Sequence, residues 1–365
     1  MNRGSNLFLR LHVDLALVGS VFIVCTIGLT LLYSASNGSS EVVFRQFVRM
    51  MIGLTVMLSI AQVSPRALLK LSPFIYLVGL LLLIAVHFFG DTSGGAARWL
   101  DLGIVRFQPA EVMKIAVPLM LAAIISNRPL PPSKRSILLC SFILVVPVFL
   151  IYQQPDLGTS LLVGFSGIIV LFLGGVSWRA IRYVSLFSLC AAPLAWVSIH
   201  SYQRERIRTL FNPENDPLEA GYHIIQSKIA IGSGGLYGKG WLNGTQSHLE
   251  FLPERATDFI FAVYCEEFGL VGVLMLMAAY LLVISRGIHV ARNAQDTFER
   301  LLSASLIITF VTYIIVNVMM VVGLIPVVGV PLPLISYGGT SMVTMMASLG
   351  MVMSILTHRK FYSRD

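Results

Sequence analysis

The chain has 365 residues, of which 56% are hydrophobic and only 12% are charged, against about 25% charged in a typical soluble domain. This composition excludes an ordinary soluble domain and indicates a protein embedded in a membrane. The four cysteines lie far apart in apolar runs, and the seven histidines include no His-Glu-x-x-His pair. Neither a disulfide framework nor a tightly held transition metal is therefore expected.

Apolar runs long enough to cross a membrane follow one another along the chain. A hydrocarbon core of about 30 Å takes roughly 20 apolar residues per helix, whereas a membrane barrel would show short segments of alternating hydrophobicity. We therefore predict an all-α integral membrane protein, with residues 1–365 forming one polytopic domain of about ten transmembrane helices. The first run is longer than a secretion signal and is expected to be retained as a span. The expected spans are 14–34, 46–61, 73–90, 109–126, 137–152, 159–173, 184–200, 259–285, 301–325 and 340–356.

The positive charges predict the orientation. Most of the 26 Lys and Arg residues fall in the N-terminal segment, the C-terminal tail and every second connection, and such segments stay in the cytoplasm. Both termini are therefore expected to be cytoplasmic. The long hydrophilic segment 201–258, between the seventh and eighth spans, is then expected to form a periplasmic loop. This asymmetry also explains the net charge of +8, which gives no support to nucleic-acid binding.

The first polar cluster covers the outer loop 91–108 and the start of the fourth span. It contains Arg98 and, after a proline that suits a helix start, Glu111 and Lys114 on one helix face. Ionisable groups there should face the bundle interior or a wet cavity, because contact with lipid is costly. The pair is either a structural ion pair or part of a site that grips an anionic headgroup, with Lys114 supplying the charge.

A second cluster joins the fifth and sixth spans. Residues 153–159 include Gln154 and Asp156 around a proline. A plain Pro-Asp turn accounts for such a segment without any function, so both interpretations stay open.

The long segment 201–258 carries helical spacing of its own. Tyr222, Ile225 and Ile229 fall at near-helical intervals within residues 219–231. This pattern predicts an amphipathic helix that lies along the membrane surface.

A glycine-rich run, residues 232–240, follows this helix and contains Lys239. It fails the P-loop pattern, because Ser233 replaces the first required glycine and Gly240 stands where Ser or Thr would bind magnesium. The run forms either a set of tight turns or a group of backbone donors for a substrate pyrophosphate.

Asp258 stands at the outer mouth of the eighth span, directly before its apolar run. If a helical turn starts at Pro253, Arg255 and Asp258 lie on one face. A carboxylate held at a membrane interface near a basic residue can serve as a general base. An N-terminal helix cap would suit Asp258 equally well.

The last outer loop, residues 326–341, contains three prolines among apolar residues, with Ser336 near its end. Irregular backbone at membrane depth is tolerated only against protein or a cavity, so we expect a re-entrant or tightly packed element. All the polar clusters then face one side of the membrane, which indicates a single outward-facing site.

Six strings, in this order, resemble the SEDS family (shape, elongation, division and sporulation). The similarity runs from about Leu15 to Lys360, nearly the whole chain. The strings are 98–103, 107–111, 154–159, 221–240, 251–263 and 331–339.

The resemblance implies a ten-helix fold in the bacterial inner membrane and peptidoglycan glycosyltransferase activity on lipid II, during lateral wall elongation and maintenance of rod shape. It also implies a complex with a class B penicillin-binding protein, the transpeptidase, and with other elongation-complex proteins. The family's essential aspartate falls on Asp258. Ala256 occupies a place where relatives often have a bulkier polar residue, and no loss of chemistry is expected from it. The candidate substrate-binding residues are Arg45, Arg98, Glu111, Lys114, Gln154, Asp156, Lys239, Arg255 and Ser336.

The family's α-linked donor and β-1,4-linked product imply a single inverting displacement. Asp258 would deprotonate the acceptor hydroxyl, and undecaprenyl pyrophosphate would leave. The charge that develops on it would need Arg45, Lys114 and a divalent cation, Mg or Mn, for which Asp258 is itself a candidate ligand. No nucleotide or organic cofactor is expected.

Two other functions are weighed against this one. A lipid II flippase would also need a polar cavity, but should show ionisable residues near the midplane and on both faces. A non-catalytic scaffold for the penicillin-binding protein would leave the outer polar clusters unexplained. The clustering on one side therefore favours the enzyme.

Overall fold

The computed structural model describes residues 12–93, 96–101, 103, 106–179, 182, 201–215, 220–248 and 254–358. Within this part, eight helices are long and apolar enough to cross a membrane, and a ninth apolar helix, Leu157–Leu173, is shorter. The prediction of a polytopic helical membrane protein is confirmed at this level. The predicted seventh span, residues 184–200, lies outside the described residues.

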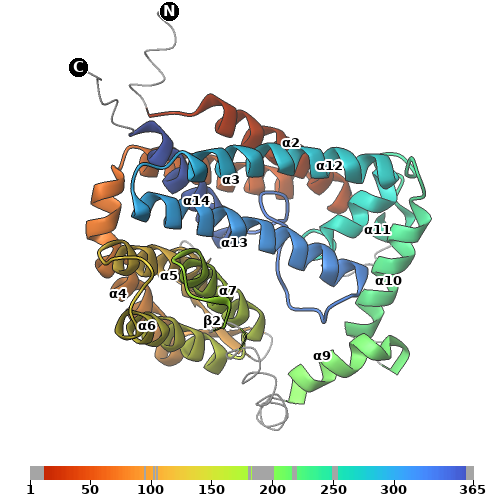
Figure 1. Cartoon of the computed structure of the whole chain (residues 1–365). Coiled ribbons are helices and arrows are strands. Elements are labelled where there is room, and N and C mark those ends of the chain that lie inside the picture. Colours follow the sequence, from red (N-terminus) through yellow and green to blue (C-terminus); the bar gives the residue numbers. More distant parts are fainter. Residues whose placement is uncertain are drawn as a thin grey trace, which may run out of the picture.

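The described helices pack together in a bundle (Figure 1). Their bounds are α2 Leu15–Ala35, α3 Ser40–Ala61, α4 Pro65–Phe89, α5 Pro109–Ser126, α6 Lys134–Gln153, α7 Leu157–Leu173, α9 Ser201–Phe211, α10 Ala220–Ser233, α11 Thr245–His248, α12 Ile260–Arg292, α13 Thr297–Val322 and α14 Thr340–Thr357, with a single 3-10 turn at Pro213–Asn215.

Several helices begin earlier than hydropathy alone predicts, because polar caps extend them. The predicted starts at residues 46 and 73 are wrong by about two turns. The hydroxyl of Ser39 accepts from the Val42 amide at the start of α3, and that of Ser64 accepts from the Ala67 amide at the start of α4. A serine cap satisfies amide groups that the first turn leaves without partners.

The loop between α4 and α5 departs from the all-helical expectation. It contains three short antiparallel strands in the order β1-β2-β3, namely β1 Asp91–Ser93, β2 Ala96–Asp101 and β3 Arg106–Phe107. Asp101 of β2 pairs in register with Arg106 of β3. This small sheet carries Arg98 towards the start of α5.

The core lies where α5, α13 and α14 meet, because these are the most buried of the candidate spans. The helices form two groups. In the first group, α4 to α7, α5 contacts α4, α6 and α7. In the second group, α14 packs on α3 and α12 packs on α2. Helix α13 contacts members of both groups, namely α5 and α7 on one side and α12 and α14 on the other (Figure 1).

The first and last described residues lie at one end of the bundle, called here the terminal end. The rings of His12 and His358 stack with their centroids 3.8 Å apart. Arg286, near the end of α12, pairs with Asp14 at the start of α2 through an Nε–Oδ2 distance of 2.7 Å. The first and last described residues thus lie on the same side of the bundle.

Helix α10 exists as predicted, and one of its faces packs on the bundle. On that face Ile224, Ser227 and Ala230 are buried, whereas Ile229 is exposed. The helix packs against α12 and α13, and the Ser227 hydroxyl donates to the carbonyl of Val321 at 2.7 Å. The predicted contact of its other face with the membrane surface stays a prediction.

The glycine-rich run packs into a break in α12. Gly269 has φ 62° and ψ −162°, which interrupts the helix and frees backbone groups. The amides of Lys239 and Gly240 donate to the carbonyls of Glu266 and Glu267, both at 3.0 Å. These contacts fit the tight-turn alternative, because those two amide groups are no longer free for a pyrophosphate.

The buried carboxylates of Glu266 and Glu267 lie directly before this break in α12. An oxygen of Glu266 accepts from the Lys239 ammonium at 2.8 Å, the Thr245 hydroxyl at 3.1 Å and the Gln246 amide at 3.0 Å. Glu267 accepts from the hydroxyl of Ser34 on α2. Polar contacts therefore hold the broken helix to the glycine-rich run and to α2.

Candidate functional site

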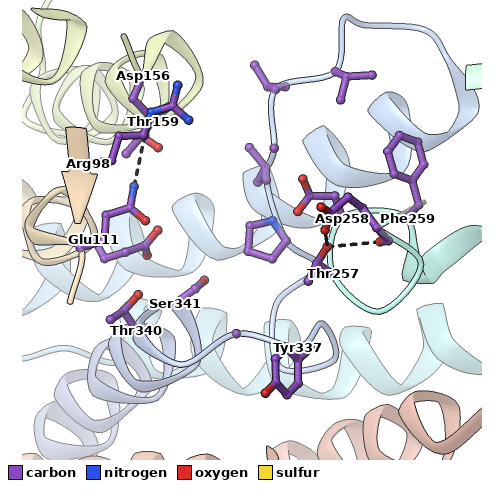
Figure 2. Close-up of a pocket in the computed structure, with 18 of the residues that line it drawn as sticks. Arg98, Glu111, Asp156, Thr159, Thr257, Asp258, Phe259, Tyr337, Thr340 and Ser341 are labelled. Carbon is purple, nitrogen blue, oxygen red and sulfur yellow. Dashed lines mark hydrogen bonds between the residues drawn. The ribbon is translucent and has the colours of Figure 1, made fainter. Parts of the chain in front are cut away.

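A cavity of about 920 Å³ opens at the end of the bundle opposite the terminal end. Figure 2 shows Thr257, Asp258 and Phe259 on one wall and Arg98, Glu111 and Asp156 on the facing wall. The last loop closes the space between them. All four polar clusters of the sequence contribute: the lining residues are Arg98, Trp99, Gln108, Glu111, Lys114, Asp156, Thr159, Glu205, Arg206, Thr209, His223, Glu254, Thr257, Asp258, Phe259, Val327 to Pro331, and Tyr337 to Ser341.

Asp258 lies in an irregular turn that precedes α12. Pro253, from which a helical turn could have started, lies outside the described residues, and residues 254–259 form non-helical turns in which Glu254 has a φ of 52°. The N-cap of α12 is Phe259, and it receives no side-chain capping bond. The Asp258 carboxylate is therefore not a helix cap and faces the cavity instead.

The surroundings of Asp258 make its carboxyl less acidic than usual. Burial raises the pKa of Asp258 from 3.8 to about 6, and the nearby Glu254 carboxylate adds to the rise. The Arg206 guanidinium opposes it. A base with a pKa in this range is mostly deprotonated at neutral pH and still accepts a proton effectively.

Glu111 and Lys114 form a buried ion pair on the facing wall. The Lys114 Nζ lies 2.5 Å from Glu111 Oε1, and each side chain is only 5% exposed. The Thr344 hydroxyl donates to the other Glu111 oxygen at 3.2 Å, and Lys114 Nζ lies 4.4 Å from the centre of the Tyr313 ring. Each charge has a partner, as a buried pair requires, and both residues still line the cavity.

Arg98 and Asp156 form the upper part of the same wall in Figure 2. Arg98 Nη2 donates to the carbonyl of Pro155 at 2.5 Å. Asp156 caps α7 by accepting from the Thr159 amide at 3.1 Å, and its second oxygen accepts from the Gln108 side chain at 3.1 Å. Asp156 thus has the structural role that a Pro-Asp turn allows, while its side chain also borders the cavity.

Ser336 lies behind the lining. Its hydroxyl donates to the carbonyl of Thr257 at 2.6 Å and accepts from the Leu332 amide at 2.8 Å. The loop is tightly packed, as expected, with Leu334 and Ile335 almost fully buried. Ser336 therefore links this loop to the turn that carries Asp258.

Arg45 and Lys239 lie outside the cavity lining. Arg45 is exposed and pairs with Glu41 one turn earlier in α3. Lys239 pairs with Glu266 at the break in α12, at 2.8 Å. The structure gives both cations a local carboxylate partner.

Gln154 and Arg255 also lie outside the lining. The Gln154 side chain is buried and donates to the carbonyl of Leu83 at 2.9 Å, so it ties the turn before α7 to α4. Arg255 is half-buried in the turn next to Asp258.

Sequence reasoning missed Arg206, Glu254 and His223, which all line the cavity. Arg206 donates to the carbonyl of Val327 at 2.9 Å, so it touches the last loop. The His223 ring stacks on Phe259, with the ring centroids 5.5 Å apart. No motif in the long polar segment marks these three residues. Helical spacing could have indicated that Arg206 lies on one face of α9, but not that this face borders the cavity.

The acidic residues of the cavity decide whether it can hold a metal ion. No group of three or more His, Cys, Asp or Glu side chains arranged to hold a metal ion occurs in the described part of the chain. Glu254 and Asp258 interact electrostatically on one wall, so two carboxylates are available there. Magnesium is commonly bound by one or two carboxylates together with substrate phosphates and water, and this donor set fits that mode.

Known proteins resemble the chain over nearly its whole length. It is 49% identical over 357 residues to "Peptidoglycan glycosyltransferase MrdB" of Escherichia coli K12, which covers 98% of this chain and 96% of that protein. It is 30% identical to "Peptidoglycan glycosyltransferase RodA" of Treponema pallidum, with 94% and 97% covered.

Solved structures share the fold. A chain of a structure named "Structural coordination of polymerization and crosslinking by a peptidoglycan synthase complex" superposes with a TM-score of 0.83 at 32% identity, covering 95% of this chain and 99% of that one. The rod shape determining protein RodA of Thermus thermophilus gives a TM-score of 0.72 at 30% identity, with 95% and 98% covered.

The family model also matches nearly the whole chain. Residues 6–361 match the FTSW_RODA_SPOVE family, whose description is "Cell cycle protein". The six strings singled out in the sequence lie inside this range. The resemblance to the SEDS family is thereby confirmed, and the chain belongs to the FtsW, RodA and SpoVE family of cell cycle proteins.

Proposed function

We propose that this chain is a multi-pass inner-membrane peptidoglycan glycosyltransferase, which polymerises lipid II into β-1,4 glycan strands during lateral wall elongation and rod-shape maintenance. The observation that carries the proposal is the position of Asp258, whose pKa is raised to about 6, across a cavity from a buried Lys114. The name of the relative that is 49% identical to the chain supports the same activity.

In the proposed reaction Asp258 acts as the general base. Its carboxylate takes the proton from the 4-hydroxyl of the acceptor N-acetylglucosamine, and that oxygen forms a bond to the anomeric carbon of the donor N-acetylmuramic acid. The bond from that carbon to the pyrophosphate breaks on the opposite face, so the α-linkage becomes β. The electron pair leaves with undecaprenyl pyrophosphate. One general base contributes about 10²–10⁴ in rate.

The leaving group needs positive charge, and the cavity offers it on two walls. Lys114 and Arg98 line one side, and Arg206 lines the side of Asp258. Fixed cations in a site shielded from water stabilise a developing negative charge more strongly than the same groups in water. Holding two lipid-anchored substrates in one cavity supplies a further large part of the rate.

A divalent cation, Mg or Mn, is part of the proposal. Glu254 and Asp258 would hold it together with substrate phosphate oxygens. Such an ion would neutralise charge on the pyrophosphate. We expect polymerisation to fall at least 10-fold in EDTA and to return when Mg²⁺ or Mn²⁺ is added. A rate unchanged by chelation would remove the metal from the proposal.

The proposed orientation puts both termini in the cytoplasm and the cavity at the periplasmic face. Asn243 lies at the cavity end and Asn293 ends α12 at the other, and both are exposed. Asn243→Cys should react with a membrane-impermeant maleimide in intact spheroplasts, whereas Asn293→Cys should react only after permeabilisation. The reverse pattern would invert the orientation and the substrate face.

A penicillin-binding partner is proposed on the same basis. The superposed structure belongs to a complex that coordinates polymerisation and crosslinking. The class B penicillin-binding protein would crosslink the glycan that this chain produces, together with other elongation-complex proteins.

The decisive test of the enzyme is Asp258→Asn. Asparagine keeps the shape of the side chain but removes the negative charge and the proton-accepting role. We expect a folded protein that still copurifies with its penicillin-binding partner and makes no glycan from lipid II, with at least a 10²-fold loss of rate. Polymerisation near the wild-type rate would exclude Asp258 from the chemistry.

The same variant separates the enzyme from the alternatives. A flippase would lose lipid II translocation in liposomes when Asp258 is replaced, even where no polymerisation is possible. A scaffold would show no polymerisation by the wild type either, although its partner would still be bound and active.

The ion pair provides a second test. Lys114→Ala should lower polymerisation about 10²-fold, because a cation near the pyrophosphate is lost. The protein should still accumulate, since the Glu111 carboxyl can bind a proton when its partner is removed. The rate should be measured with lipid II and the amount of folded protein by size exclusion.

Two further variants control this test. Arg286→Ala breaks the ion pair with Asp14 at the terminal end and should leave the rate unchanged. A charge-swapped Glu111→Lys, Lys114→Glu protein keeps a pair but moves the cation. Restored activity in the swapped protein would mean that the pair is architectural.

A further inference from the structure

One side-chain amide on α13 touches the backbone of Asp258. Asn317 is fully buried in the last third of α13, where its nearest neighbours in sequence are apolar. Its side-chain nitrogen donates to the carbonyl of Asp258 at 2.9 Å and to the carbonyl of Val330 at 2.7 Å. A buried amide in a transmembrane helix is costly unless its hydrogen bonds are made, so these two contacts account for its presence.

The two contacts also fix which way the amide points. A carboxamide nitrogen carries two hydrogens and its oxygen carries none. Because both neighbours are carbonyl oxygens, only the nitrogen can face them, and both hydrogens are used. The oxygen of Asn317 has no hydrogen-bond partner among the described residues. The donor function of the amide is therefore the one that the fold employs.

Because one nitrogen binds both carbonyls, the last loop lies next to the turn that carries the Asp258 carboxylate. Val330 follows Gly329, which has a φ of 73°. A methyl group built on Gly329 would lie 3.4 Å from Asp258 Oδ2, so loop backbone lies in contact range of the carboxylate. Asn317 links the position of this loop to the position of Asp258.

The carbonyls of the two residues before Asp258 accept hydrogen bonds from the last loop. The Tyr337 amide donates to the carbonyl of Ala256 at 2.9 Å, and the Ser336 hydroxyl donates to that of Thr257 at 2.6 Å. With Asn317 on Asp258, three consecutive carbonyls are held. Asn317 is the member of this set that acts on Asp258 itself and that comes from a rigid helix.

We propose that Asn317 is a positioning residue for Asp258, which fixes the turn and the loop in the arrangement that presents the carboxylate to the acceptor hydroxyl. The proposal rests on the proposed function. Asn317 does not line the cavity and acts only through the backbone of its neighbours. Its loss should therefore affect the chemical step more than substrate binding.

The test compares Asn317→Leu, which has similar volume and no donor, with Asn317→Asp, whose carboxyl can donate at most one hydrogen bond. Lipid II polymerisation is measured for the full chain with its partner. We expect kcat to fall 10- to 100-fold with KM within about 2-fold, because small displacements of reacting groups are that costly.

Two controls accompany these variants. Ser227→Ala removes another buried hydrogen bond to α13, to the carbonyl of Val321, away from the cavity. It should lower thermal stability and leave kcat and KM unchanged. The amount of folded protein is measured for every variant, so that loss of protein is not mistaken for loss of kcat.

The outcomes separate the inference from the proposed function. If the wild type makes no glycan, the proposed function fails. If the wild type polymerises and both Asn317 variants keep its kcat, or lose only thermal stability as Ser227→Ala does, the positioning role is overturned. Failure of both variants to accumulate would also overturn it, because the amide would then be a requirement of folding.

Discussion

Hydrocarbon offers no hydrogen-bond partner, so polar groups inside this bundle depend on the protein itself. The buried carboxylates follow this constraint: Glu111 pairs with Lys114, Glu266 with Lys239 and Asp14 with Arg286. Asp258 differs, because it faces the cavity and its pKa is raised towards neutrality. These three buried acids are thus paired with cations, whereas the Asp258 carboxylate stays open to the cavity, where the proposed proton transfer would take place.

The break in α12 shows how the same constraint shapes the backbone. A glycine with positive φ at 269 interrupts the helix, and the freed groups bond to the glycine-rich run. The amides of Leu270 and Val271 donate to carbonyls of Gly235 and Leu236. The short helical segment between Asp258 and this break is consequently held at both ends, by the last loop and α13 at one and by the run at the other.

Apolar periodicity predicted the spans and their order, because each must bury or expose a continuous apolar surface. It could not predict caps such as Ser64, nor the serine at the centre of the packed face of α10. The motifs pointed to Asp258, Glu111 and Lys114, which share a cavity. Arg206, His223 and Asn317 were missed because contacts made across the fold, not local spacing, bring them to the site.

The arrangement of the two walls explains how a base and several cations can share one cavity without cancelling each other. Lys114 is bound to Glu111, and Arg98 donates to the carbonyl of Pro155, so neither is drawn across to Asp258. On the near wall Glu254 offsets Arg206, whose charge would otherwise lower the pKa of Asp258. Among the described residues, contacts to its backbone rather than an ion pair hold Asp258 in place. A carboxylate positioned through its main chain keeps its side-chain oxygens free, as the proposed transfer of the substrate proton requires.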